Sequence, residues 1–444
     1  MKRRLWTMLA LLVGLAMLLS SCAQQPAPTP VPPTEVPAAA AEEPKPTEEP
    51  APEPVTITFW YALGGSKGET FMAMVEDFMK EYPHITVEAT YTGGYGDTAQ
   101  KVLASLASDT LPDGGVIPAG PLWTGREGNF LIDEYIKGPD GLDMDDFWPV
   151  LWTYNEWEGK VCSLPFNNST LVLYYNKDLM QKAGLDPEKP PQTWDELKSM
   201  AKQIVEKAQG DTPVWGVDTK SPDWTLKYLI TQAGGNIMNE NSSEPMFASE
   251  AGYEAMTWWK SLVDEGLMPP AQHKSARDLF IAGNLGFLYS STGSVGTVKS
   301  GAQFDWNTTF CPKNERYGGT VGGAALCLFP SDKAKEDATW TFLKWLLSPE
   351  NAVRWTLATG YVPVRKSSLQ DPDMQALFED APRYRAGFEQ LEYARAYPHF
   401  WEMGGMDGYF KDALEKVELG VMEPKDALDE ASDKLKADMA KTGS

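Results

Sequence analysis

The sequence has few of the residues on which most enzyme active sites depend. It contains three histidines and four cysteines in 444 residues, and it has no G-x-S-x-G motif. His84, His273 and His399 have no neighbour at a metal-ligand spacing. Catalytic triads and metal sites therefore lack their parts. We expect a protein that is not an enzyme and that binds no metal or cofactor.

Positive charge is also scarce. The chain has 39 Lys and Arg residues against 62 Asp and Glu residues, which gives a formal net charge of -23. Without the N-terminal Lys2, Arg3 and Arg4 the charge falls to about -26. Nucleic-acid affinity comes largely from basic side chains on phosphates, so the composition argues against a nucleic-acid partner. Carboxylate pairs such as Asp133 and Glu134 leave a secreted glycoside hydrolase as an alternative, although an acidic chain offers such pairs by chance.

The apolar run near the N-terminus is too short to span a membrane comfortably. It extends from Leu5 to Leu19, follows a basic start and ends in LSSC. This pattern matches the lipobox of bacterial lipoproteins and predicts a signal peptide over residues 1–21 and lipidation of Cys22. An ordinary secretory signal with a chance cysteine is the alternative. Residues 22–54 are mainly Pro, Ala, Thr and Glu, which predicts a disordered tether. The protein would then be extracytoplasmic, and only its lipid would anchor it to the cell membrane.

Three further cysteines cannot all be paired with one another. Cys162, Cys311 and Cys327 lie in the apolar contexts KVCSL, TTFCP and ALCLF. An odd number excludes a complete disulfide framework, and the apolar surroundings favour buried thiols over catalytic ones.

Strand and helix patterns alternate from residue 55 onward. Residues 55–61 and 84–91 show the period of two that is typical of strands, and residues 68–83 carry apolar side chains at helical spacing. The alternation resumes with a strand at 171–176, and the chain is mainly helical beyond residue 334. Short connections between strand, helix and strand predict parallel sheets with helices on both faces, in two α/β units.

Several motifs resemble a known family. The stretch PFNNST-LVLYYNKDLMQKAGLDPEKPPQTWDEL is similar, almost position by position, to bacterial solute-binding proteins of the maltose and glycerol-3-phosphate group. GNLGFLYSSTGSV, GGAALCLFP, LLSPENAVRW and ATGYVPV resemble later landmarks of that family, in the same order. The resemblance covers roughly residues 55–440. It implies the α/β, two-lobed type II fold of periplasmic binding proteins, with a ligand cleft between lobes that three crossing segments join.

The resemblance also implies a division of the chain and a set of ligand contacts. Lobe 1 would comprise residues 55–164 and 285–347, and lobe 2 would comprise 165–284 and 348–444. PFNNST would be the first crossing segment, which puts Asn167 and Asn168 at the cleft; a plain polar turn is the alternative. Five residues match ligand-contacting positions of the family: Tyr95, Ser169, Ser291, Gly323 and Tyr361. At the glycine, the family's main chain approaches the ligand closely, which only glycine permits.

Aromatic residues at expected loops and element ends offer flat faces for a sugar ring. They are Trp60, Tyr61, Trp123, Trp224 and Trp401. For each of them, packing in the core is the alternative.

Two positions depart from the glycerol-3-phosphate-binding members of the family. Ala119 falls where an acidic residue contacts the polyol, and Asp407 falls where an arginine holds the phosphate. A dianion without a bidentate guanidinium loses a strong charge-assisted contribution. This favours a neutral sugar or oligosaccharide over sn-glycerol-3-phosphate or a glycerophosphodiester.

The resemblance implies a function in transport. It implies a monomeric lipoprotein that captures a carbohydrate or polyol phosphate and delivers it to an ABC importer, a permease pair with cytoplasmic ATPases. A receptor-coupled sensor with the same ligand stays open as an alternative.

Overall fold

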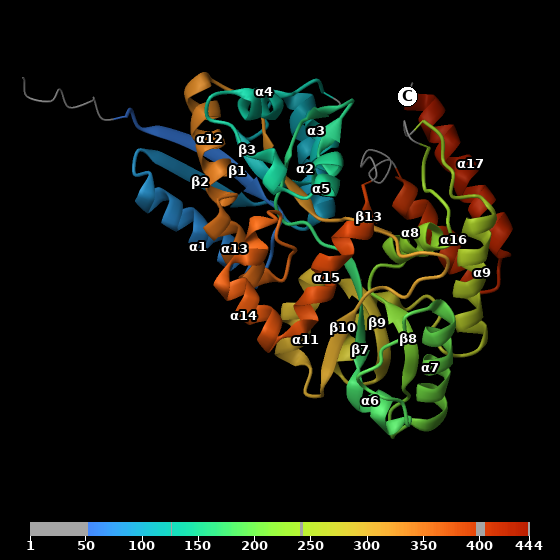
Figure 1. Cartoon of the computed structure of the whole chain (residues 1–444). Helices are drawn as coiled ribbons and strands as arrows, with labels where there is room; N and C mark the ends of the chain where they lie inside the picture. The colour runs from blue at the N-terminus through green and yellow to red at the C-terminus, as the bar shows by residue number, and fades with distance from the viewer. Residues whose placement is uncertain (1–51, 126, 240–242, 397–404, 443–444) are drawn as a thin grey trace, which may run out of the picture. The chain divides into compact units, whose positions relative to one another are not determined.

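The computed structural model describes residues 52–125, 127–239, 243–396 and 405–442 (Figure 1). From Pro52 onward the chain forms one compact unit. The predicted signal peptide, the lipidation site Cys22 and most of the tether lie outside the described residues. Within the described ranges, no helix combines the length and the apolar character that crossing a membrane requires.

The first sheet contains five strands in the order β2-β1-β3-β12-β6. Their bounds are β1 Val55–Tyr61, β2 Ile85–Tyr91, β3 Gly114–Pro118, β6 Leu164–Pro165 and β12 Ala324–Leu328. Strand β1 is parallel to β2 and β3, which confirms the parallel arrangement predicted for this part of the chain. Strand β12 comes from much later in the sequence and pairs antiparallel with β3 and β6.

Helices α1 (Ser66–Glu81), α2 (Tyr95–Ser108) and α12 (Lys333–Leu346) pack against this sheet. The apolar spacing predicted for residues 68–83 forms the buried face of α1. Phe59 of β1 contacts both Phe71 of α1 and Phe342 of α12, with ring centroids 5.9 and 5.1 Å away. One strand residue is therefore covered by helices from distant parts of the chain.

The second sheet contains four strands in the order β10-β7-β9-β8. Their bounds are β7 Leu171–Asn176, β8 Trp215–Thr219, β9 Leu285–Ser291 and β10 Trp306–Thr309. Every residue of β7 is buried, as expected for a strand covered on both faces. Helices near this sheet include α7 (Trp194–Lys207), α8 (Pro222–Gln232), α9 (Glu250–Asp264), α16 (Asp407–Glu418) and α17 (Pro424–Thr442).

The strand pairing corrects the expected division of the chain at two places. Residues 285–347 do not all belong with the first sheet, because β9 and β10 pair with β7 in the second. Residues from 348 onward do not all belong with the second, because α13 (Pro349–Thr359) packs against α1. Arg354 of α13 forms an ion pair with Asp77 of α1 at 2.8 Å. The chain therefore returns to the first sheet at β12 and stays near it through α13.

Three segments connect the two sheets, and hydrogen bonds link them. They are residues 166–170, 310–323 and 381–396, which we call the first, second and third crossing segments. Ser169 and Gly322 exchange two backbone hydrogen bonds, each of 2.9 Å. In the second and third segments, β11 (Gly319–Thr320) pairs with β13 (Ala394–Arg395). The connections between the sheets are thus hydrogen-bonded to one another.

The remaining elements are short. The strands are β4 Glu156–Trp157 and β5 Lys160–Val161. The helices are α3 Gly120–Thr124, α4 Leu131–Lys137, α5 Pro149–Tyr154, α6 Lys177–Lys182, α10 Ala276–Ile281, α11 Val295–Gly301, α14 Pro372–Asp380 and α15 Arg385–Glu389. The 3-10 turns are η1 Met144–Asp146, η2 His273–Ser275, η3 Thr292–Ser294, η4 Ser367–Gln370, η5 Pro382–Tyr384 and η6 Gln390–Tyr393.

The three cysteines of the described chain are buried, as the sequence predicts, and all three are free. Burial raises the pKa of the Cys162 thiol to about 11. Burial likewise raises the pKa of Cys311 and that of Cys327 well above the ordinary value. All three thiols are therefore protonated and unreactive near neutral pH.

Candidate binding pocket

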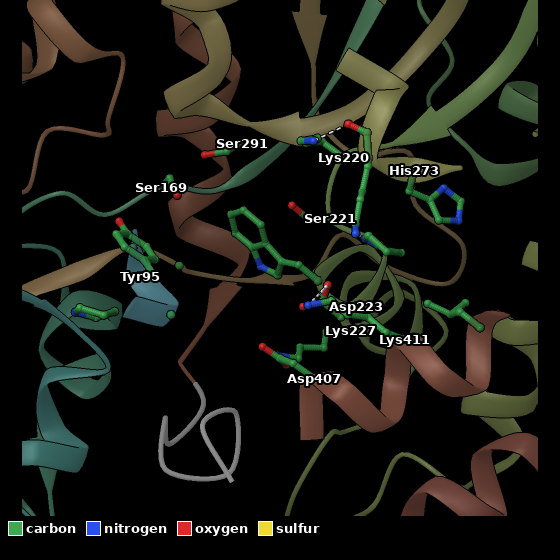
Figure 2. A pocket seen from close by; sticks show the side chains of 18 of the residues that line it. Tyr95, Ser169, Lys220, Ser221, Asp223, Lys227, His273, Ser291, Asp407 and Lys411 are labelled. Atoms are coloured by element: carbon green, nitrogen blue, oxygen red, sulfur yellow. Dashed lines mark hydrogen bonds and ion pairs between the residues drawn. The ribbon is translucent and has the colours of Figure 1, made fainter. Parts of the chain in front are cut away.

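A pocket of about 960 Å³ lies where the crossing segments meet α2, α8 and α16. Its volume is near the upper end of the range of about 300–1,000 Å³ that is common for small-molecule sites. Figure 2 shows that Tyr95, Ser169 and Ser291 lie on one side of the pocket. Charged side chains, including Lys220, Asp223, Lys227, Asp407 and Lys411, lie on the other side (Figure 2).

The fold brings six of the predicted contact residues together around this pocket. They come from six stretches that are far apart in the sequence, which are the start of α2, the first crossing segment, α8, the end of β9, the second crossing segment and the loop after α13. The six are Tyr95, Ser169, Trp224, Ser291, Gly323 and Tyr361.

Hydrogen bonds fix the aromatic side of the pocket. The Tyr95 hydroxyl accepts a hydrogen bond from Asn167 Nδ2 at 2.9 Å, and Asn167 Oδ1 accepts one from the backbone N–H of Ala324 at 3.0 Å. Desolvation of the hydroxyl, reinforced by Tyr361, raises the pKa of Tyr95 well above its ordinary value. Tyr95 is therefore a neutral hydroxyl at physiological pH, able to donate to a solute oxygen.

Asn167 and Asn168 are buried and do not line the pocket. Asn168 accepts a backbone hydrogen bond from Val362 at 3.0 Å through its carbonyl, so it ties the loop after α13 to the first crossing segment. Their side chains support the pocket wall from behind. The expectation that these amides face the cleft is corrected, because Asn167 bonds to the Tyr95 hydroxyl and the Ala324 backbone, and Asn168 Nδ2 donates to the carbonyl of Gly322 at 3.4 Å.

Gly323 is required by the backbone around it. Its φ is 126°, and a Cβ at this position would lie 2.3 Å from the carbonyl oxygen of Asn167. The sequence prediction attributed this glycine to the close approach of a ligand. The structure gives a different reason, which is the close approach of the first and second crossing segments.

Of the predicted aromatic residues, Trp224 lines the pocket and its Nε1 donates a hydrogen bond to Thr320 Oγ1 at 2.6 Å. The prediction placed Trp60, Tyr61 and Trp123 in loops or at element ends. Trp60 and Trp123 are indeed the second-last residues of β1 and α3, and Trp123 Nε1 donates a hydrogen bond to the carbonyl of Pro118 at 2.8 Å. Tyr61 packs between the rings of Phe71 and Tyr91. None of these three lines the pocket, and Trp401 lies outside the described residues.

The charged side of the pocket was not predicted from the sequence. Lys227 Nζ lies 2.7 Å from Asp407 Oδ1, and its side chain is only 3% exposed. Lys411 Nζ lies 3.4 Å from Asp223 Oδ1. The stretch GGMDG around Asp407 contains no basic residue, but in the fold α8 brings Lys227 to this carboxylate. The spacing of four residues between Asp223 and Lys227, and between Asp407 and Lys411, was the available signal.

A histidine between two carboxylates borders the charged side. His273 Nδ1 lies 2.6 Å from Asp218 Oδ1, and its Nε2 lies 2.9 Å from Glu418 Oε1. Burial alone would lower the pKa of His273, but the bonds to the two carboxylates outweigh it and raise the pKa to about 9. Burial raises the pKa of Asp218. The imidazole is thus a cation near neutral pH, and it joins β8, η2 and α16 at the pocket, which His273 and Glu418 line.

The described residues contain no group of three or more His, Cys, Asp and Glu side chains that could hold a metal ion. What the pocket offers is tyrosine and tryptophan rings, serine hydroxyls and paired charges. Such groups can bind ring faces and hydroxyls of a solute.

Residues 73–382 match the family model described as bacterial extracellular solute-binding protein. The sn-glycerol-3-phosphate-binding periplasmic protein UgpB of Escherichia coli K12 is 25% identical over 399 residues, covering 85% of this chain and 90% of that protein. The cyclic alpha-maltosyl-1,6-maltose binding protein from Arthrobacter globiformis has a TM-score of 0.74 at 27% identity, over 87% of this chain and 99% of that one. UgpB from Mycobacterium tuberculosis in complex with glycerophosphocholine has a TM-score of 0.78 at 23% identity, over 89% and 100% of the two chains. These similarities confirm the predicted two-lobed type II fold.

Proposed function

The chain belongs to the family of bacterial extracellular solute-binding proteins, and from this premise we propose that it captures a neutral sugar or oligosaccharide for an ABC importer. The solute binds in the pocket between the two lobes, and closure of the lobes surrounds it without altering it. The protein is a binding protein and not an enzyme.

The observation that carries the proposal is the pairing of charges along the pocket wall. Four lysines, the His273 cation and four carboxylates line the pocket, and Lys227, Lys411 and His273 each have a carboxylate partner. Of the two paired lysines, Lys227 has the less exposed side chain. Its Nζ already lies 2.7 Å from the Asp407 carboxylate. A phosphate would have to compete with this carboxylate for Lys227 and come close to the other carboxylates of the pocket. Paired carboxylates and ammonium groups can instead accept from and donate to sugar hydroxyls.

The opposite side of the pocket suits a sugar ring. Trp224, Tyr95 and Tyr361 supply aromatic surface, and Ser169 and Ser291 supply short hydroxyl groups. A sugar has apolar C–H faces and a polar rim, so an aromatic face and a few polar groups together can fix its orientation. The volume of about 960 Å³ has room for more than one ring.

A specific observation also favours a second candidate, sn-glycerol-3-phosphate or a glycerophosphodiester. Two similar proteins carry such solutes in their names or complexes, namely UgpB of Escherichia coli and UgpB from Mycobacterium tuberculosis with glycerophosphocholine. Lys220 and Lys274 also line the pocket and could meet a phosphate. The neutral solute remains our proposal because each lysine of α8 and α16 at the pocket has a carboxylate partner.

The proposal includes the anchoring and the partners. The LSSC motif supports cleavage before Cys22 and a lipid anchor in the cell membrane, with the acidic domain outside the cytoplasm. The loaded monomer then docks on a permease pair whose ATPases lie inside the cell. Incorporation of labelled palmitate into the wild-type chain, and its loss in Cys22→Ser, tests the anchor. Neighbouring permease and ATPase genes would favour import over a sensory role.

A solute panel tests the proposed function. It should contain maltose, maltotriose, glycerol-3-phosphate and glycerophosphocholine, each measured by calorimetry and by thermal unfolding. A solute at one hundred times its Kd stabilises the fold by about 2.7 kcal/mol. The corresponding rise in Tm is about 5–10 °C. A response to glycerol-3-phosphate alone would refute the neutral solute, and shortened oligosaccharides in the mixture would refute the assignment as a binding protein.

A further inference from the structure

Helix α8 contacts both the pocket and the crossing segments. Its residues Asp223, Trp224 and Lys227 line the pocket, whereas Tyr228 is 2% exposed. Residues four positions apart lie on one face of a helix. The Trp224 and Tyr228 rings meet edge to face, with their centroids 6.0 Å apart. One face of α8 therefore continues from the pocket into the protein interior.

The Tyr228 hydroxyl bonds to the backbone of β7 and to the backbone of the second crossing segment. It accepts a hydrogen bond from the N–H of Leu171 at 2.9 Å and donates one to the carbonyl of Thr320 at 3.0 Å. Leu171 begins β7 directly after the first crossing segment, and Thr320 lies in the second. The carbonyl of Leu171 also accepts a bond from Gln390 Nε2 of the third segment at 2.9 Å. The hydroxyl thus bonds at a point where all three segments are linked.

The second crossing segment passes directly against the Tyr228 ring. A Cβ at Gly319 would lie 2.1 Å from that ring, so a side chain there would force the two apart. Trp224 Nε1 donates to Thr320 Oγ1 at 2.6 Å. Two successive turns of α8 therefore hold the same residue of the crossing segment. A shift of that segment must carry α8 with it or break these bonds.

We propose that Tyr228 is a positioning residue that fixes the pocket-lining helix α8 to the crossing segments. A change in the relative orientation of the two sheets then moves Trp224, which lines the pocket. This inference rests on the proposed function, because the coupling acts when the lobes close on a solute. A solute that contacts Trp224 acts on a helix whose next turn is bonded to β7 and to the second crossing segment, so binding and closure are linked by direct contacts.

Tyr228→Phe removes both hydrogen bonds and keeps the ring. Tyr289→Phe is the matched control, because Tyr289 is also 2% exposed and its hydroxyl has no hydrogen-bond partner in the described chain. Spin labels at Leu103→Cys on α2 and Lys202→Cys on α7 report the distance between the lobes in the ligand-free protein. Both positions are exposed, and the three cysteines of this unit are buried. With Cys22→Ser in every variant, only the introduced thiols react.

We expect a broader distance distribution in Tyr228→Phe than in the wild type and in Tyr289→Phe. Hydrogen exchange at the Leu171 amide should become about tenfold faster, because its acceptor is lost. Exchange at the Leu173 amide in the same strand is the control, because global destabilisation would accelerate exchange at both amides equally. Unchanged distances, or equal acceleration of both amides, would overturn the proposal. Neither measurement uses a solute, so failure here is distinct from failure of the proposed function.

Discussion

Lys227 of α8 and Asp407 of α16 form an ion pair in the pocket wall, with 2.7 Å between Nζ and Oδ1. One turn along each helix, Asp223 and Lys411 form a second pair with the signs exchanged. The two pairs join α8 to α16, and within each pair the charges cancel. Burying an ammonium group costs free energy unless a partner compensates its charge. The Asp407 carboxylate therefore compensates Lys227, and an anionic solute must compete with it.

Removing this carboxylate should make the pocket more receptive to anions. In Asp407→Asn, we expect the affinity for glycerol-3-phosphate to rise about tenfold, which corresponds to ~1.4 kcal/mol. The reason is that Lys227 keeps its charge and loses a competing partner. Affinity for maltotriose should change less. Calorimetry of both solutes against the wild type measures the difference.

Asp264→Asn serves as the control for the loss of one negative charge. Asp264 pairs with Lys260 on the exposed side of α9 and does not line the pocket. It should leave both affinities unchanged. If phosphate bound the wild type and Asp407→Asn equally well, Asp407 would have no part in selecting the solute.

Trp224 should be the tryptophan that meets the solute. In Trp224→Phe we expect sugar affinity to fall about tenfold, because the ring becomes smaller and loses its bond to Thr320. Trp60→Phe is the matched change, since Trp60 lies in β1 and does not line the pocket. Titration of the panel sugars with tryptophan fluorescence as the readout should show a signal in Trp60→Phe and a much smaller one in Trp224→Phe. The reverse pattern would move the site to the end of β1.

Local patterns were sufficient to predict the elements, and the family resemblance was sufficient to predict much of the pocket. The period of two in 55–61 and the helical spacing in 68–83 correspond to β1 and α1. The residues carried over by the family resemblance meet in one pocket because their spacing along the chain follows the family's fold. The close approach of the Asn167 carbonyl to Gly323 could not be predicted from local patterns, since the two residues are far apart in sequence.

The features that could not be predicted from the sequence depend on contacts between distant segments. LGFLYS is an apolar strand that either sheet could bury, and only its pairing with β7 assigns it to the second sheet. The ion pair between Lys227 and Asp407 could not be predicted either, because no local pattern indicates that α8 and α16 pack together. Trp60 and Trp123 lie near element ends as predicted, but whether such a ring lines the pocket depends on how distant segments pack around β1 and α3.

Gly319 should be intolerant of any side chain. In Gly319→Ala we expect a loss of stability of about 1–3 kcal/mol, because the new methyl group would overlap the Tyr228 ring. Gly296→Ala in α11 is the control, because a Cβ there meets nothing within 4 Å. That change should be neutral or slightly stabilising, since alanine favours a helix over glycine. Urea unfolding of the two variants measures both effects, and equal stabilities would contradict the close packing at Gly319.

The buried charge of His273 should make stability depend on pH. Its pKa is raised from 6.5 to about 9, so protonated His273 stabilises the folded state. This contribution is complete below pH 6.5, where the unfolded state is also protonated, and it is lost as pH rises through 9. A shift of this size corresponds to a stabilisation on the order of 3 kcal/mol. The carboxylates of Asp218 and Glu418 hold the proton, and the edge of the Trp259 ring is the other close contact.

Urea unfolding at intervals between pH 6 and pH 9.5 tests this dependence on His273. The free energy of unfolding of the wild type should fall across this range, and that of His273→Gln should fall much less and start from a lower value. His84→Gln is the control, because His84 lies in the turn before β2, away from the pocket and its carboxylates. It should keep the wild-type slope. A wild-type stability that stays level from pH 7 to pH 9, or a slope that His273→Gln retains, would show that the two carboxylates do not hold the proton on this imidazole.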